Sequence, residues 1–305
     1  MNLPPSMRVF ERGWLSSNNV LFVDDVCAAL VDTGYASHAP QTLALVQRAL
    51  DGRPLDLIVN THLHSDHCGG NAALQAAWPC RTAIPAAEAE TVRTWDETRL
   101  TFRATGQQCP RFGFTETLAP GASLTLGGLE WTVLGAPGHD PHSLMLYCAA
   151  ARILISADAL WENGFGVIFP ELEGESGFAE QQAVLDIIST LAIDIVIPGH
   201  GAPFAAIDPA LERANSRLAW LREDPARNAK NALKVLIVFR LLDERAMHFD
   251  ALLRMLADAQ AMRAAATILA PASGWPALLR TVIGELAKSG ALHVDGERIL
   301  SGAAA

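Results

Sequence analysis

The chain has 305 residues, of which 50% are hydrophobic and 18% are charged. This composition can fill a sizeable core, so it excludes general disorder. The net charge of -10 argues against a protein that binds nucleic acid over its whole surface.

Three features of the chain bear on its location. The N-terminal segment 1–5 has no basic start followed by an apolar run, which predicts that there is no signal peptide. The longest apolar stretches have the length of strands or are interrupted by charges, so no membrane span is predicted. The cysteines are scattered and odd in number, which is typical of reduced thiols: Cys27, Cys68, Cys80, Cys109 and Cys148. We therefore expect a cytoplasmic protein without membrane contact.

The first part of the chain predicts short strands separated by turns. The strands are expected at residues 20–23, 28–34 and 57–60, and a helix is expected over 41–50. A segment rich in histidine, 61–67, directly follows the last of these strands and leads through Gly69-Gly70 into another helical run. The segment therefore lies on a loop between a strand and a helix, where α/β folds commonly place chemistry.

The middle of the chain continues this alternation. Residues 86–104 are expected to be helical, and 178–192 form another helical pattern. Strands are expected at 124–126, 131–134, 144–148, 153–155 and 193–197. Clusters of strands followed by helices predict two sheets with helices outside them.

The tail differs in pattern and in charge. A helix over 209–222 is broken at Asp224-Pro225, and further helices are expected at 228–242, 249–256 and 278–288. Two short strands joined at Asp295-Gly296 follow as a hairpin. Three helices and a hairpin are the pattern of a winged helix. Residues 225–305 carry 10 basic and 7 acidic side chains, a net of +3, whereas residues 1–224 carry a net of -13. We predict a catalytic domain over 1–222 and a small winged-helix-like domain over 223–305.

Four side chains that bind metals lie within six positions: His62, His64, Asp66 and His67. Imidazoles and carboxylates are ligands of zinc, iron and manganese. Residues two apart on an extended turn project in the same direction. His62 and His64 can therefore share one metal ion, while Asp66 and His67 reach a second.

Three further residues of the same kind follow apolar strands. His139 lies in Pro137-Gly138-His139, Asp158 follows the strand at 153–155, and His200 follows the strand at 193–197. Strand ends can converge on one edge of a sheet, so we predict that these residues complete the metal site.

The whole set resembles the metallo-β-lactamase superfamily, over about residues 10–205: a His-x-His-x-Asp-His box, then His139, Asp158 and His200 in the order of the family. The resemblance implies an αββα sandwich with the site at one edge of the sheets. It also implies that His62, His64 and His139 hold one metal, that Asp66, His67 and His200 hold the other, and that Asp158 bridges them. The expected cofactors are two divalent metal ions, zinc first and iron or manganese as alternatives. A hydroxide between the two metals would attack an ester, thioester or lactone, and Asp66 is the candidate for handling a proton.

Differences between this sequence and individual branches of the family narrow the range of small-molecule substrates. Members that cleave lactams usually lack the aspartate at the position of Asp158, so its presence argues against a β-lactamase that degrades antibiotics. The segment 158–166 resembles glyoxalase II, but Val167 stands where that branch has a basic residue for the glutathione carboxylate, which disfavours glutathione thioesters. Lactone-cleaving members have tyrosine where this chain has Trp161, which can donate a hydrogen bond but cannot act as an acid. Trp161, Phe165 and His142 are the candidate substrate-binding residues. Core packing is the alternative role for Phe165, and a catalytic role is the alternative for Trp161. His142 can instead support the metal ligands or face solvent.

Two other functions stay open. The tail resembles the winged helix of a subgroup that contains acyl-ester and thioester hydrolases and a ribonuclease-like member. A nuclease or phosphodiesterase guided by this tail is therefore the first alternative, although acidic residues interrupt its basic ones and nucleic acid is not the expected partner. In the hydrolases, such a unit more often caps the site or forms a homodimer contact. An oxygen-using enzyme with a single iron is the second alternative, and the complete second ligand set disfavours it.

Overall fold

The computed structural model describes residues 2–302 and contains two β-sheets in its catalytic part. The first sheet has the order β1-β2-β3-β4-β5-β6. Its strands are β1 (Met7–Phe10), β2 (Asn19–Val23), β3 (Ala28–Val31), β4 (Leu57–Val59), β5 (Arg81–Pro85) and β6 (Glu116–Leu118). The second sheet has the order β11-β10-β9-β8-β7. Its strands are β7 (Ser123–Leu126), β8 (Leu129–Gly135), β9 (Leu144–Cys148), β10 (Ile153–Ala157) and β11 (Ile195–Pro198).

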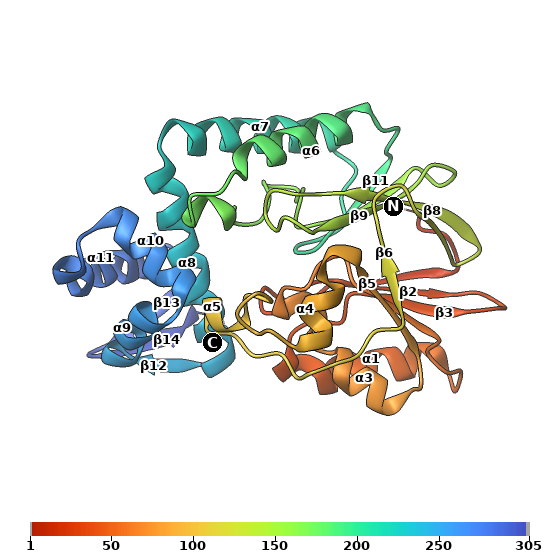
Figure 1. Cartoon of the computed structure of the whole chain (residues 1–305), viewed down its shortest axis with the longest axis horizontal. Helices are drawn as coiled ribbons and strands as arrows, with labels where there is room; N and C mark the ends of the chain where they lie inside the picture. The colour runs from red at the N-terminus through yellow and green to blue at the C-terminus, as the bar shows by residue number, and fades with distance from the viewer. Residues whose placement is uncertain (1, 303–305) are drawn as a thin grey trace.

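The two sheets lie face to face, with helices on both outer faces (Figure 1). Alternate residues of β2 explain this arrangement, because side chains of a strand point to opposite faces. Val20 and Phe22 pack between the sheets, whereas Leu21 packs against the helical layer with α1 (Ala39–Leu50) and α3 (Asn71–Ala77). The second sheet is covered by α6 (Phe178–Thr190) and α7 (Ile207–Glu223). The predicted αββα sandwich is confirmed.

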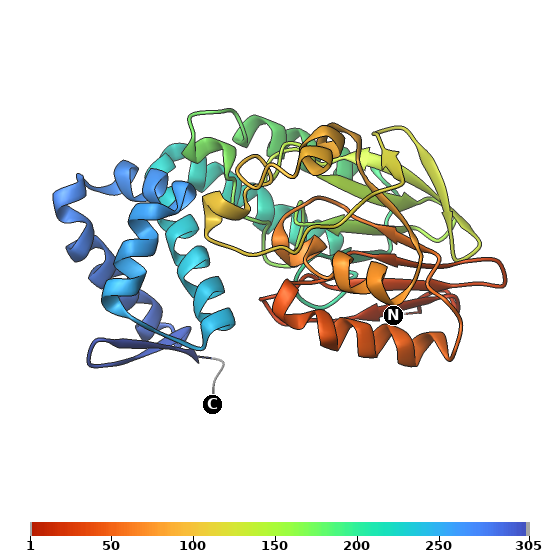
Figure 2. The ribbon, with the colours of Figure 1, turned by 60° about the horizontal axis from the view of Figure 1, so that its bottom comes forward.

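The C-terminal part packs helices against a small sheet of order β12-β14-β13 (Figure 2). Its elements are α8 (Pro225–Glu244), β12 (Ala246–His248), α9 (Phe249–Asp258), α10 (Gln260–Leu269), α11 (Trp275–Lys288), β13 (Leu292–Asp295) and β14 (Arg298–Ser301). Asp224 separates α7 from α8, because its side chain accepts a hydrogen bond from the Ala226 amide and Pro225 opens α8. The sequence prediction lacked α10. The winged-helix assignment and the boundary at residue 222 stay predictions.

The predicted helix over 86–104 is wrong as a single element. The structure has α4 (Ala89–Thr94) and α5 (Phe102–Thr105) instead, and Trp95 and Thr101 between them adopt φ angles of 58° and 65°. Asp96 competes with the helix, since its side chain accepts hydrogen bonds from the amides of Thr98 and Arg99. Among the helices within residues 2–302, none has the length and apolar character needed to cross a bilayer.

Candidate metal centre

The predicted metal ligands come from loops at one edge of the paired sheets. His62 and His64 lie between β4 and the short helix α2 (Ser65–Cys68), which carries Asp66 and His67. The remaining ligands follow the ends of β8, β10 and β11: His139, Asp158 and His200. The structure thus brings together every ligand that the sequence predicted, and their side chains are almost completely buried except for that of Asp66.

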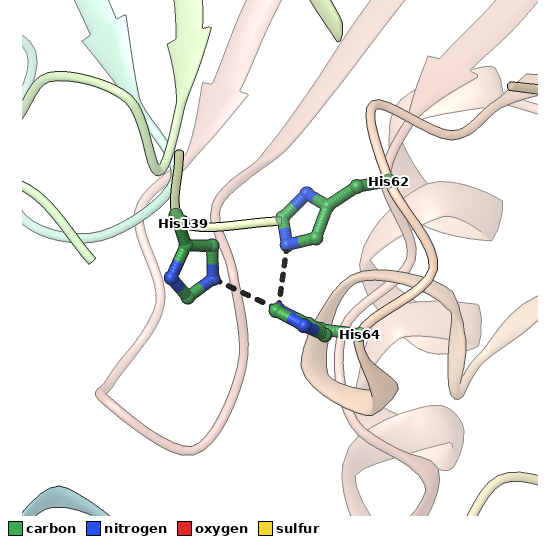
Figure 3. Close-up of side chains that lie close together, drawn as sticks. All are labelled: His62, His64 and His139. Carbon is green, nitrogen blue, oxygen red and sulfur yellow. Dashed lines mark hydrogen bonds between the residues drawn. The ribbon is translucent and has the colours of Figure 1, made fainter. Parts of the chain in front are cut away.

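The first group consists of three imidazoles that face one another (Figure 3). His64 Nδ1 lies 3.1 Å from His62 Nε2 and 2.8 Å from His139 Nε2. The outer nitrogen of His139, Nδ1, donates a hydrogen bond to the backbone oxygen of Val167 at 2.5 Å. The proton of His139 is therefore on Nδ1, and the lone pair on Nε2 points at the other two rings. Three converging nitrogens are the donor set that a divalent cation requires.

The second group contains Asp66, His67 and His200. Asp66 Oδ2 lies 3.0 Å from His200 Nε2 and 3.9 Å from His67 Nε2. His67 Nδ1 donates to Asp32 Oδ2 at 2.7 Å, so Nε2 is the ring nitrogen that faces the site. This Nε2 is buried and has no hydrogen-bond partner within residues 2–302. A buried polar atom without a partner is costly, so this nitrogen fits a metal ion.

Asp158 lies between the two groups. Its Oδ2 is 3.3 Å from His139 Nε2, 3.5 Å from His67 Nε2 and 3.9 Å from His200 Nε2. Its other oxygen, Oδ1, accepts a hydrogen bond from the indole nitrogen of Trp161 at 3.2 Å. One oxygen is therefore held by Trp161, while the other faces ligands of both groups, as a bridging carboxylate would.

The electrostatics of the site favour cations. Burial is the main cause that places the pKa of His62 well below its usual value, and burial together with His139 lowers the pKa of His64 to about 4. Burial opposes ionisation of Asp158, but His67 and His200 outweigh it and hold the pKa of this carboxyl well below its ordinary range. Burial lowers the pKa of His67, but Asp158, Asp32 and Asp66 outweigh burial and raise it well above its usual value. The same carboxylates would stabilise a metal cation in place of the proton, and neutral imidazoles and ionised carboxylates are the forms that bind metals.

Asp32 is a supporting residue that the sequence analysis missed. It is buried at the end of β3 and has a φ of 56°. Besides His67, it accepts hydrogen bonds from the amide and the hydroxyl of Thr61, at 2.9 and 2.8 Å. A carboxylate behind a metal-binding histidine fixes the orientation of the ring. The predicted strand over 28–34 enclosed Asp32, whereas β3 ends at Val31, so the signal that identified Asp158, a polar residue directly after a strand, was hidden here.

A cavity of about 120 Å³ opens beside the ligands. Trp161 and Phe165 both line it, in agreement with the prediction, whereas His142 lies elsewhere, with its Nε2 3.7 Å from Glu88. Sequence reasoning missed Trp14, whose ring stacks on His200 with the centroids 5.4 Å apart. It also missed the wall that α7 and α8 provide: Arg217, Asn231, Val235, Leu236 and Phe239. The C-terminal part of the chain therefore completes the cavity.

Known proteins resemble the chain in sequence. It is 32% identical over 170 residues to a hydroxyacylglutathione hydrolase from Dechloromonas aromatica, covering 56% of this chain and 52% of the relative. A hydroxyacylglutathione hydrolase from Brucella anthropi is 26% identical over 228 residues, covering 75% and 74%. A human acyl-coenzyme A thioesterase is 27% identical over 169 residues, covering 50% and 58%. In the first and third cases the matched region spans little more than half of the relative.

Solved structures share the fold over almost the whole chain. A beta-lactamase domain protein from Burkholderia ambifaria has a TM-score of 0.61 at 20% identity, covering 98% of this chain and 93% of that one. A metallo-beta-lactamase family protein from Thermus thermophilus has a TM-score of 0.58 at 20% identity, covering 98% and 100%. Residues 12–200, more than half of the chain, match the family described as the Metallo-beta-lactamase superfamily. With its ligand set assembled at the edge of an αββα sandwich, the chain belongs to the metallo-beta-lactamase superfamily.

Proposed function

We propose that the protein is a hydrolase with two divalent metal ions that cleaves the thioester bond of a small acyl substrate. The observation that carries this proposal is the pair of ligand groups with Asp158 Oδ2 between them. When bound, two such ions acidify a water molecule and polarise the substrate carbonyl. Zinc is the metal that this set of imidazoles and carboxylates suits best, and iron and manganese are alternatives for the test.

The side chains of the site have separable roles in this proposal. Asp66 directs Oδ2 to His200, which leaves its second oxygen to take a proton from the attacking water and pass it to the leaving group. Trp161 positions Asp158 through the hydrogen bond to Oδ1. Because the indole N–H is engaged there, Trp161 acts as a positioning residue and as an aromatic wall.

The walls of the cavity favour an apolar acyl group. Trp14, Phe169 and Phe239 line it beside the ligands. A second cavity of about 430 Å³ shares Trp14, Val235 and Phe239 with the first and continues along α8, where its wall is mainly aliphatic. Apolar walls gain free energy by removing hydrocarbon from water. The substrates named for the hydroxyacylglutathione hydrolases and for the acyl-coenzyme A thioesterase support a thioester in particular.

We propose that the C-terminal unit forms a wall of the site and does not bind nucleic acid. Lys230 and Lys234 both pair with Glu285, at 2.5 and 2.7 Å. Arg240 pairs with Asp243 and Glu244. Side chains engaged in this way do not form a track for phosphates. We further infer that residues 223–305 form a winged-helix unit that covers the catalytic domain of residues 1–222.

Metal analysis combined with a substrate panel tests the proposal. Protein purified without added metal is expected to hold close to two equivalents, and His67→Ala is expected to hold about one. The metal-loaded protein is then assayed with thioesters of graded acyl length, matched oxygen esters, lactones and a phosphodiester. Thioester turnover that Asp66→Asn lowers by 100-fold or more, with metal retained, supports the proposal (an estimate for loss of a proton-transfer group). Absence of thioester turnover, or turnover of the phosphodiester alone, overturns it.

A further inference from the structure

The strongest unexplained feature near the site is the guanidinium of Arg217. Arg217 is half-buried on α7 and lines the same cavity as the metal ligands. Its guanidinium carbon lies 5.1 Å from the centre of the Phe165 ring. It forms no hydrogen bond or ion pair with any residue in 2–302, and burial lowers its pKa. The guanidinium of Arg12, which is also half-buried, instead donates to Asn19, Thr42 and Gln41.

The chain makes room for this cation. Gly164 has a φ of 124°, and a Cβ added there would lie 2.6 Å from an Arg217 nitrogen. Gly164 also closes the tight turn that begins at Trp161, whose amide donates to the Gly164 oxygen at 2.6 Å. The guanidinium is therefore packed between a glycine turn and an aromatic ring instead of extending into solvent.

A second unpaired donor lines the same cavity from α8. The side-chain nitrogen of Asn231 is buried and has no hydrogen-bond partner within residues 2–302. Two other polar side chains that line the cavity, outside α7 and α8, form hydrogen bonds: Gln107 Oε1 accepts from Ser65, and Thr105 donates to the Thr101 oxygen. Buried donors without acceptors are costly. The buried Asn231 nitrogen and the half-buried Arg217 guanidinium both lack an acceptor in one cavity, which indicates that a ligand supplies it.

The charge of that ligand follows from the lining of the cavity. Among its described lining residues, the carboxylates are Asp66 and Asp158, which are proposed to bind metal. No protein carboxylate is thus left for Arg217. We infer that Arg217 and Asn231 form a subsite for a carboxylate that the substrate carries away from its scissile bond. The planar guanidinium matches a carboxylate through two parallel hydrogen bonds.

This subsite qualifies the expectation drawn from Val167. The missing basic residue at that position argued against glutathione thioesters, but α7 brings a basic residue to the cavity from 50 positions further along the chain. The inference rests on the proposed function, because it takes this cavity to be the substrate site. Its test therefore uses binding as well as turnover.

The binding experiment compares two three-carbon thiols, 3-mercaptopropanoate, which ends in a carboxylate, and 3-mercapto-1-propanol, which ends in an uncharged hydroxyl. In both, the thiol is expected to reach the metals, and only the first carries a carboxylate. Calorimetric titration of the metal-loaded wild type should give about 10- to 100-fold tighter binding of the carboxylate. Arg217→Met should abolish this preference and leave the affinity for the alcohol unchanged. Arg217→Lys should retain part of it, since lysine keeps the charge but loses the planar fork.

The matched control is Arg213→Met, one turn earlier on α7. Arg213 is exposed and donates to the Glu162 oxygen outside the cavity, so this variant removes the same charge without touching the subsite. It should keep the wild-type preference. Equal binding of both thiols by the wild type overturns the inference, as does an equal loss for both thiols in Arg217→Met. If Arg217→Met does not fold, Arg217→Lys and the wild-type comparison still decide.

Turnover gives the second measurement. Thioesters that end in a carboxylate, in the acyl half or in the thiol half, are compared with their methyl esters. In Arg217→Met, the KM for the carboxylate substrate should rise about 10-fold or more while that for the methyl ester stays constant. If no thioester is cleaved, the proposed function fails, while the thiol comparison still tests the subsite. An unchanged KM in Arg217→Met overturns the inference.

Discussion

Asp32 determines how His67 presents its lone pair. The Asp32→Asn substitution keeps the shape of the side chain but removes the charge that holds the proton on His67 Nδ1. We expect this variant to bind its second metal about 10- to 100-fold more weakly, because outer partners of metal-binding histidines have effects of this size. Titration with a competing chelator measures the two affinities separately.

The control for this prediction is Asp56→Asn. Asp56 also accepts a backbone hydrogen bond beside the first sheet, from Ala28, but it does not contact the ligands. It should leave both metal affinities at the wild-type level. Wild-type binding of both metals by Asp32→Asn would show that the orientation of His67 does not depend on Asp32.

Protonation of His38 at acidic pH is expected to destabilise the fold. Burial, followed by the charge of Arg12, lowers its pKa below the ordinary value of 6.5, and its Nδ1 lies 2.9 Å from the Ser16 hydroxyl. The unfolded chain therefore binds a proton at a pH where the folded chain does not, and the stability contributed by neutral His38 is lost as the pH falls below about 6.5. Urea unfolding at pH 7.5 and 5.5 should show a smaller acid-induced loss for His38→Gln than for the wild type. An equal loss in both proteins would contradict this role.

The loops that carry the ligands need glycine at two positions where the backbone passes close to the side chain of a ligand. A Cβ added at Gly166 would overlap the ring of His139, and one added at Gly199 would overlap Asp158. Gly166→Ala should therefore displace His139 and lower the metal content measured on purified protein by about one equivalent. Gly284→Ala is the matched control, since a Cβ there meets open space on α11; it should keep both metals and stabilise the helix by about 0.5–1 kcal/mol. Two retained metals in Gly166→Ala would refute the prediction.

The sequence predicted most elements where the signal is local. Alternating or continuous apolar runs located β2, β3, β4 and the strands of the second sheet, and each ligand was visible as a polar residue after such a run. The segment 86–104 was misread because its helical composition is interrupted by Asp96, whose side chain competes for backbone amides. Arg217 and Asn231 gave no signal, because their meeting with the ligands depends on how α7 and α8 pack.

At the scale of the whole molecule, Phe239 joins the C-terminal helices to the catalytic part. It contacts Tyr35 edge-on, with the ring centres 5.1 Å apart, and packs with Leu15 while lining the cavity. Phe239→Ala should lower the free energy of unfolding by about 3 kcal/mol and raise the KM for apolar substrates. Urea unfolding and steady-state kinetics measure the two effects.

Val235→Ala is the comparison for this variant. Val235 lines the same cavity but is 42% exposed, so its truncation should affect KM with little loss of stability. A Phe239→Ala protein as stable as the wild type would show that the contact with Tyr35 and Leu15 does not hold the two parts together.

Val167 belongs to both parts of the molecule at once. Its side chain is buried in the core that α8, α9 and α10 share, while its carbonyl oxygen accepts a hydrogen bond from His139 Nδ1. Loosening of the C-terminal helices therefore withdraws the partner that fixes one ligand. Metal release and unfolding of the C-terminal unit should then form one cooperative event. A metal chelator would lower the melting temperature of the distant helices, and the metal content would report on whether the tail of the chain is folded.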